Sequence, residues 1–223
     1  MKVEYMDHSG SDLLVVNAAR ASFGKESEWE YVPHEEIADC EVQVLSDKDK
    51  KLINYLAREK HVLPFRHPQI TLRCKAPIFL ARQLGKHQVG MSWSEESRRY
   101  ITDDVEVYTP DVWRGKADNV KQGSSDEEII DAHAVNTVVV SKALEGYKEL
   151  LRIGVAPEMA RMILPQSAMT TWVWTGSLLS FYQMYKLRAE AHAQREAQDF
   201  SEMVKRVIAP LYPESWKALE EHV

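Results

Sequence analysis

The sequence lacks the short glycine-rich motifs that most often hold nucleotide phosphates. Its 223 residues contain neither G-x-G-x-x-G nor G-x-x-x-x-G-K-[ST], and they contain no H-E-x-x-H and no G-x-S-x-G. These absences exclude the common dinucleotide loop, the P-loop, the zinc-protease helix and the hydrolase nucleophile elbow. Whatever the protein binds is therefore held by other side chains.

Cysteine is scarce, and long hydrophobic runs are missing. The two cysteines, Cys40 and Cys74, lie far apart and form neither a C-x-x-C pair nor a zinc-ligand spacing. We expect two reduced thiols and no metal site. No signal peptide opens the sequence, and no apolar stretch approaches the ~20 residues that span a membrane. We therefore expect a cytoplasmic protein without a membrane partner.

The balance of charge is acidic, with 28 Lys and Arg against 34 Asp and Glu and a net charge of −6. General nucleic-acid-binding proteins are usually basic, so we expect no nucleic-acid partner. Any site for an anion must instead be a local cluster of Arg and Lys. The length allows a single domain over residues 1–223 with a sizeable core.

Hydrophobic patterning predicts a helix-rich chain with a few scattered strands. Residues 13–16 are a short apolar run that predicts a strand, followed by a short helix or turn that Gly24 stops. The alternation over residues 69–75 predicts a half-buried strand, and residues 105–108 are another candidate. Strands and helices do not alternate regularly, so we expect an α+β fold.

Helix boundaries are indicated by capping residues and prolines. Ser46 with Asp49, and Ser125 with Glu128, form capping-box patterns. Helices are predicted from residue 46, over 77–84, from 125 to about 152, between the prolines at 157 and 165, and over 175–187 and 191–209. The polar stretch 114–125 is expected to be a mobile loop.

Residues 77–100 hold a dense set of hydrogen-bonding side chains. An apolar helical start runs into Gly85, and donors and acceptors follow: Lys86, His87, Gln88, Ser92, Ser94, Glu95, Ser97, Arg98 and Arg99. Such a stretch is costly to bury unpaired, and an anionic, oxygen-rich ligand is the obvious partner. Taken singly, each cation could be a solvated charge or a helix cap, and His87 a structural histidine. Spacing alone does not show that they converge with Arg161 and Arg188.

This segment resembles the flavin-dependent thymidylate synthases. The resemblance rests on A-P-I-F-L-A-R-Q at 76–83, K-H-Q at 86–88 and S-E-E-S-R-R-Y at 94–100. Supporting segments are A-A-R-A-S-F at 18–23, P-F-R-H at 64–67, A-R-M-I-L-P at 160–165, L-R-A at 187–189 and H-A-Q at 192–194. They follow the family's order, which is far more specific than a single motif.

The resemblance implies an α+β fold in which helices flank a twisted, mainly antiparallel sheet. It implies an enzyme that converts dUMP to dTMP, with 5,10-methylenetetrahydrofolate as carbon donor and FADH2 as hydride donor. NADPH would reduce FAD again. It also implies a homotetramer with active sites between subunits, and a mechanism in which no cysteine attacks the pyrimidine.

Matching positions imply the site residues. Those implied for dUMP are Gln83, Lys86, Glu95, Ser97, Arg99, Arg161 and Arg188. Those implied for FAD are Ser22, Leu63, Arg66, His87, Gln88, Val89, Ser94, Glu95 and Gln183. Two are implied for catalysis: Arg188 would touch and polarise the uracil, and His61 would lie near flavin and folate. The reduced flavin would carry most of the chemistry.

The chain departs from the family pattern in its basic motif. The usual family motif is Arg-His-Arg, followed by seven residues and then Ser. Here Lys-His-Gln at 86–88 is followed by eight residues and then Ser97. Lys86 keeps the charge of the first arginine and loses its fork, whereas Gln88 loses the charge. Ser94 replaces an asparagine. We expect the extra residue to form a small bulge that leaves Glu95 and Ser97 in register.

A second departure affects the flavin positions. The family's Asn-x-Arg element is Ser-Leu-Leu at 177–179, so the arginine's role cannot pass to Leu179. Arg66 stands where an acid is common, and we hypothesise that it supplies the missing cation beside the FAD pyrophosphate. Two alternatives stay open: a flavin- and folate-dependent pyrimidine nucleotide hydroxymethylase, and a non-catalytic nucleotide- or RNA-binding relative without flavin.

Overall fold

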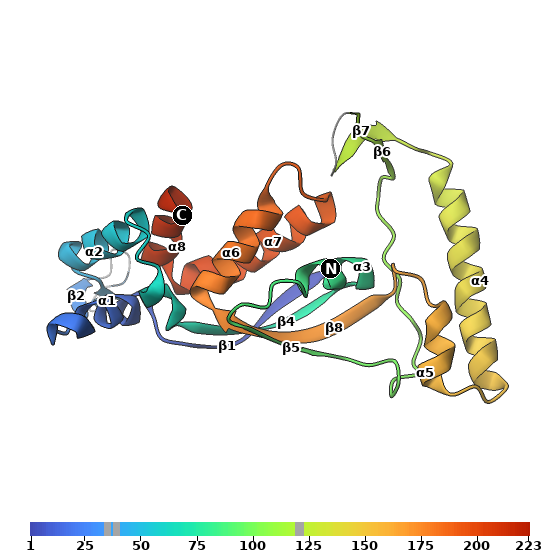
Figure 1. Cartoon of the computed structure of the whole chain (residues 1–223), viewed down its shortest axis with the longest axis horizontal. Coiled ribbons are helices and arrows are strands. Elements are labelled where there is room, and N and C mark those ends of the chain that lie inside the picture. Colours follow the sequence, from blue (N-terminus) through green and yellow to red (C-terminus); the bar gives the residue numbers. More distant parts are fainter. Residues whose placement is uncertain (34–36, 38–40, 119–122) are drawn as a thin grey trace.

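The computed structural model describes residues 1–33, 37, 41–118 and 123–223, so Cys40 lies outside the described residues. Its centre is an antiparallel sheet in the order β1-β4-β8-β5. The strands are β1 (Lys2–Ser9), β4 (Gln69–Pro77), β8 (Met169–Ser177) and β5 (Met91–Glu95). Helices α6 (Leu178–Ala189) and α7 (Arg195–Ile208) lie over one face of the sheet (Figure 1). The expected α+β fold with a mainly antiparallel sheet and flanking helices is confirmed.

The sheet buries one face because its central strands alternate in polarity. In β4, Ile70, Leu72 and Cys74 are fully buried, whereas Arg73 between them is exposed. On β8, Trp172 and Trp174 turn to the same core. Trp172 stacks on Trp93 of β5, with ring centroids 4.3 Å apart. The strand predicted over 69–75 is confirmed, and Cys74 is a buried free thiol.

One end of the molecule is built from the N-terminal segments and the last helix (Figure 1). These are α1 (Asp12–Arg20), η1 (Ala21–Phe23), β2 (Glu30–Pro33), β3 (Glu41–Val44), α2 (Asp47–Arg58), η2 (Leu63–Arg66), η4 (Ala209–Leu211) and α8 (Pro213–His222). The capping box at Ser46 is confirmed, since its Oγ accepts from the Asp49 amide. Asp12 ties the two termini together, because its carboxylate accepts from the amides of Glu214 and Ser215 at the start of α8.

The other end carries α3 (Ile78–Leu84), the hairpin of β6 (Arg114–Lys116) and β7 (Ser124–Glu128), α4 (Ala132–Arg152), α5 (Pro157–Ala160) and η3 (Arg161–Ile163). Figure 1 shows α4 standing away from the sheet, beside α5. Tyr147 is the buried residue of α4. The helices predicted over 77–84, up to residue 152 and between the prolines at 157 and 165 are confirmed.

Several predicted boundaries are wrong. Residues 13–16 belong to α1, because a short buried apolar run suits a helix as well as a strand. Residues 105–108 make only the single bridge Val107–Ala168. Ser125 lies in β7 and caps nothing, so the long helix begins at Ala132. Parts of the supposed loop 114–125 pair as β6 and β7, while residues 119–122 lie outside the described residues.

The two C-terminal helices also begin later than predicted. Residues 175–177 complete β8, and Ser177 then caps α6 by accepting from the Ser180 amide. The last predicted helix, over 191–209, begins at Arg195. Within the described part of the chain, no helix is long and apolar enough to cross a membrane. The same residues contain no cluster of three or more His, Cys, Asp or Glu suited to a metal ion.

Candidate active site

A cavity of about 990 Å³ lies among α3, the turn that follows it, β5 and the η3 segment. Its volume suits a nucleotide-sized ligand. The charged side chains in its wall are Arg82, Lys86, Glu95, Glu96, Arg98 and Arg161. Four cations against two acids make a local positive surplus in a chain whose net charge is −6. The cavity is therefore suited to an anion.

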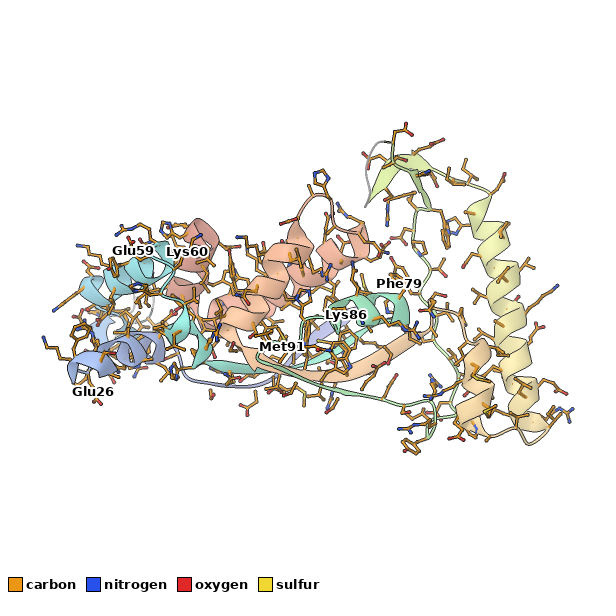
Figure 2. The ribbon with its side chains drawn as sticks, viewed as in Figure 1. Glu26, Glu59, Lys60, Phe79, Lys86 and Met91 are labelled. Carbon is orange, nitrogen blue, oxygen red and sulfur yellow. The ribbon has the colours of Figure 1, made fainter. Side chains whose placement is uncertain are left out.

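The turn after α3 brings the basic motif to the cavity. The Gly85 amide donates to the Ala81 carbonyl at 2.8 Å, and the His87 amide donates to Leu84 at 2.9 Å. These bonds close the helix and direct Lys86, His87 and Gln88 along the cavity wall. Figure 2 labels Lys86, in the turn after α3, and Met91, the first residue of β5 in the central sheet, and both line the cavity.

Gly90 lets this turn approach α6 closely. Its φ is +69°, and a Cβ there would lie 2.6 Å from Ser180 Oγ. From Met91 to Glu95, the pairing of β5 with β8 has no shift in register. The bulge predicted for the extra residue is therefore absent from the strand, and the left-handed turn at Gly90 precedes it. A side chain at position 90 would be both strained and obstructed.

Glu95 is held firmly at the end of β5. Its Oε1 accepts from Thr170 Oγ at 2.7 Å, and its Oε2 accepts from Trp93 Nε1 at 3.1 Å. Trp93 also lines the cavity and is supported from behind by Trp172. The wall thus combines a fixed carboxylate with an aromatic surface, which suits a ligand that has both N–H donors and a planar ring.

Arg188 reaches this region from the last turn of α6. Its Nε donates to His87 Nε2 at 3.0 Å, and its Nη2 donates to the Gln83 carbonyl at 3.4 Å. Burial and then the charge of Arg188 lower the pKa of His87 below its usual value. Burial also lowers the pKa of Arg188. His87 lines the same cavity as Arg161, so Arg188 adjoins this cavity through its hydrogen bond to His87.

Gln83 lies on α3 next to the lining residue Arg82 and carries an unsatisfied acceptor. Its side-chain Oε1 is buried and has no hydrogen-bond partner within the described chain. A buried acceptor without a donor is costly, and a ligand N–H would remove that cost. The cations and Trp93 that line the cavity fit a nucleotide or flavin ring. Leu179, by contrast, is buried in the core and cannot reach a cofactor.

The structure brings together only part of the implied set. Five of the implied residues line the cavity: Lys86, His87, Gln88, Glu95 and Arg161. Arg188 adjoins it through His87, and the Gln83 carbonyl accepts from Arg188. Ser97 and Arg99 lie just beyond β5, where Ser97 Oγ accepts from the backbone amide and from Nε of Arg99, both at 3.3 Å. Val89 and Ser94 are exposed.

The remaining implied residues do not line this cavity. They are Ser22 on η1, His61 after α2, Leu63 and Arg66 on η2, and Gln183 on α6, and all five are exposed. Figure 2 marks Glu26, four residues after Ser22, at the far end of the molecule from Lys86. Within one chain, the implied residues therefore do not all meet at this cavity.

Sequence reasoning did not assign a role to two basic side chains of the wall. Arg82 lies four residues before Lys86, so both occupy one side of the segment that ends α3. The helix predicted over 77–84 already placed Arg82 near its end, so its closeness to Lys86 could have been inferred from the sequence. Arg98 lines the cavity while its Nη1 donates to the Asp103 carbonyl at 2.7 Å. No local sequence pattern distinguishes Arg98, which lines the cavity, from the neighbouring Arg99.

Known proteins resemble the chain along nearly its whole length. Residues 3–214 match the family described as thymidylate synthase complementing protein. A flavin-dependent thymidylate synthase of Thermosipho africanus is 35% identical over 96% of this chain and 88% of its own. Another, from Thermus thermophilus, is 33% identical over 99% of this chain and 76% of its own.

Solved structures agree with these relatives. The UMP/dUMP methylase PolB from Streptomyces cacaoi, bound with 5-Br dUMP, has a TM-score of 0.81 and 30% identity, covering 99% of this chain and 95% of its own. The same methylase bound with 5-Br UMP also has a TM-score of 0.81, with 29% identity, and covers 99% of this chain and 93% of its own. On the family match, the identities and their coverage, this chain belongs to the flavin-dependent thymidylate synthases.

Proposed function

We propose that the protein catalyses the reductive methylation of dUMP to dTMP, with FAD as cofactor and 5,10-methylenetetrahydrofolate as carbon donor. Reduced FAD, when bound, supplies the hydride that completes the methyl group, and NADPH is the reductant that regenerates it. The observation that carries the proposal is the cationic cavity at which Lys86, Glu95 and Arg161 meet the His87–Arg188 pair. A single domain over residues 1–223 is proposed to contain these elements.

The side chains of the cavity have separate tasks toward dUMP. Lys86 and Arg161 bind the phosphate and sugar, since both are cations in one wall. Arg188 faces the uracil edge and stabilises the negative charge that develops on the ring during attack from C5. The buried Oε1 of Gln83, which has no partner in the described chain, accepts a hydrogen bond from a ligand N–H. Glu95, already fixed by Thr170, keeps the nucleotide in register.

The residues outside the cavity act from other copies of the chain. We propose that Ser97 and Arg99 complete the dUMP site and that Ser22, His61, Leu63, Arg66 and Gln183 complete the flavin and folate site across subunit boundaries of a homotetramer. Val89, Ser94, His87 and Gln88 hold the flavin from the cavity side. The five residues proposed for the flavin and folate site are each exposed in their own chain, as a shared site requires: Ser22, His61, Leu63, Arg66 and Gln183.

Self-association is supported by the surface of α4. Val135, Val138 and Val139 are 64%, 54% and 60% exposed and lie at helical spacing on one side. Apolar side chains grouped in this way favour burial against another protein surface. A second copy of the chain is the occupant that the shared-site proposal requires.

The deciding experiment identifies the nucleotide product under anaerobic conditions. Reduced protein, dUMP and methylenetetrahydrofolate are mixed, and each component is omitted in turn. We expect a product heavier than dUMP by CH2, formed only in the complete mixture. A gain of CH2O would instead assign the hydroxymethylase alternative. A colourless protein that takes up no FAD and forms no product would indicate the non-catalytic relative.

UMP is a second candidate substrate. Its support is the structural similarity to PolB, a UMP/dUMP methylase bound in separate structures with 5-Br dUMP and 5-Br UMP. Replacing dUMP by UMP in the same assay tests this directly. Methylation of UMP at a comparable rate supports dual use, and its absence restricts the site to the deoxynucleotide.

A further inference from the structure

His87 and Arg188 form a pair with a defined polarity. A guanidinium only donates hydrogen bonds, so His87 Nε2 must be the acceptor in its 3.0 Å contact with Arg188 Nε. The ring proton then resides on Nδ1, and the imidazole is neutral. The Gln83 carbonyl takes a second N–H of the same guanidinium, from Nη2. Two of the five donors are thereby anchored to the protein.

We propose that neutral His87 is a positioning residue for catalysis, which orients the Arg188 guanidinium so that its three free N–H groups face the uracil. The inference rests on the role proposed above for Arg188. His87 acts through Arg188 and does not itself transfer a proton in this role. This positioning role is separate from the flavin contact proposed for His87 above.

A protonated His87 would abolish this arrangement. Both ring nitrogens would then be donors, so Nε2 could no longer accept from Arg188, and two positive charges would be in contact. The other charged groups around the cavity are Arg82 on α3, Lys86 in the turn, Glu95 on β5, Glu96 and Arg98 after it, and Arg161 on η3. Burial and the adjacent Arg188 keep the pKa of His87 low, which favours the accepting form at neutral pH.

Two substitutions separate positioning from packing. In His87→Gln, the amide oxygen can still accept from Arg188 and does not titrate. In His87→Leu, a side chain of similar bulk has no acceptor. We expect kcat of the Leu variant to fall roughly 10- to 100-fold, the range for loss of a hydrogen bond to a charged group, and the Gln variant to recover most of it. His8→Gln, on β1, is the matched control.

The pH dependence of kcat tests positioning, because a loss of packing alone would not change it. Wild-type kcat should fall on the acid side as His87 protonates, and His87→Gln should lack that acid limb. Bound flavin per subunit, measured from its absorbance, checks that cofactor loss does not cause the rate change. Equal losses in the Gln and Leu variants, or an unchanged acid limb in the Gln variant, would overturn the proposal.

A spectroscopic test does not depend on turnover. In protein labelled with 15N-histidine, the ring signals that disappear in His87→Gln belong to His87. We expect a neutral ring protonated at Nδ1 at about pH 7.5, above the usual histidine pKa. A ring protonated at Nε2 overturns the inference even if the enzyme is active. If the wild-type protein forms no product, the proposed function fails, while this measurement still decides the geometry of the pair.

Discussion

Removing the Asp49 carboxylate should destabilise the N-terminal end of the molecule by about 3 kcal/mol. Asp49 Oδ1 accepts from Arg20 Nη2 at 2.6 Å and from Ser27 Oγ at 3.0 Å, and Oδ2 accepts from Ser46 Oγ at 2.9 Å. These bonds join α1 and its continuation, which carries Ser22, to the start of α2. The side chain of Asp49 is 3% exposed and that of Arg20 is 15% exposed.

The magnitude follows from what Asp49→Ala leaves behind. Loss of one partner from a buried ion pair costs about 3–5 kcal/mol, because the other charge stays poorly solvated. Arg20 keeps some access to water, so we expect the lower end of that range. For a chain of this size, the midpoint of thermal unfolding should fall by roughly 6–12 °C. Asp47→Ala, at the exposed first position of α2, should cost less than about 1 kcal/mol.

The assay is urea and thermal unfolding at one fixed protein concentration, because association alters apparent stability. Burial alone would raise the pKa of Asp49, but hydrogen bonds from Arg20, Ser46 and Ser27 lower it overall. Its stabilising effect is therefore complete above the usual carboxyl pKa of 3.8 and disappears as the pH falls through the lowered value. Equal stability of the Asp49 and Asp47 variants at neutral pH would refute the reasoning.

Three further predictions concern binding and assembly. Arg66→Ala should weaken FAD binding about tenfold at low salt, with the difference shrinking as salt screens the charge, and an unchanged Kd across a salt series would reject the relocated-cation hypothesis. Arg82→Gln should raise KM for dUMP roughly tenfold with little change in kcat, because it removes a cavity cation beside Lys86, while Arg206→Gln on α7 serves as control. Val138→Glu should reduce the assembly size measured by sedimentation, and an unchanged tetramer would exclude this part of α4 from the interface.

The sequence predicted best what short-range chemistry determines. The Ser46 capping box and the alternation in β4 involve neighbouring residues, and both appear as expected. The start of α6 was misplaced because the small residues Thr-Gly-Ser at 175–177 run directly into the helical segment. Pairing with β4, which sets Ser177 opposite Gln69, decides that these residues are strand. Such a partner lies far away along the chain and leaves no local trace.

In the candidate site, too, single residues could be predicted from the sequence, whereas contacts between distant residues could not. Resemblance identified His87 and Arg188 singly, yet their contact joins residues 101 positions apart. It assigned His87 to flavin, and only the folded geometry reveals that Nε2 is engaged by a guanidinium. Arg82 was passed over because an exposed arginine on a short helix is normally a solvated charge. The positive surplus of the cavity becomes visible only when Arg161 is brought opposite α3.

The stacked indoles beside the cavity give the protein a built-in optical reporter. Trp93 borders the ligand space and shares a close parallel contact with Trp172, which in turn touches Phe200. Entry of a ring against Trp93 would change its emission, and a flavin nearby would quench it by energy transfer. Intrinsic fluorescence can therefore follow loading of the pocket in real time without a label, and Trp93→Phe should silence much of that signal.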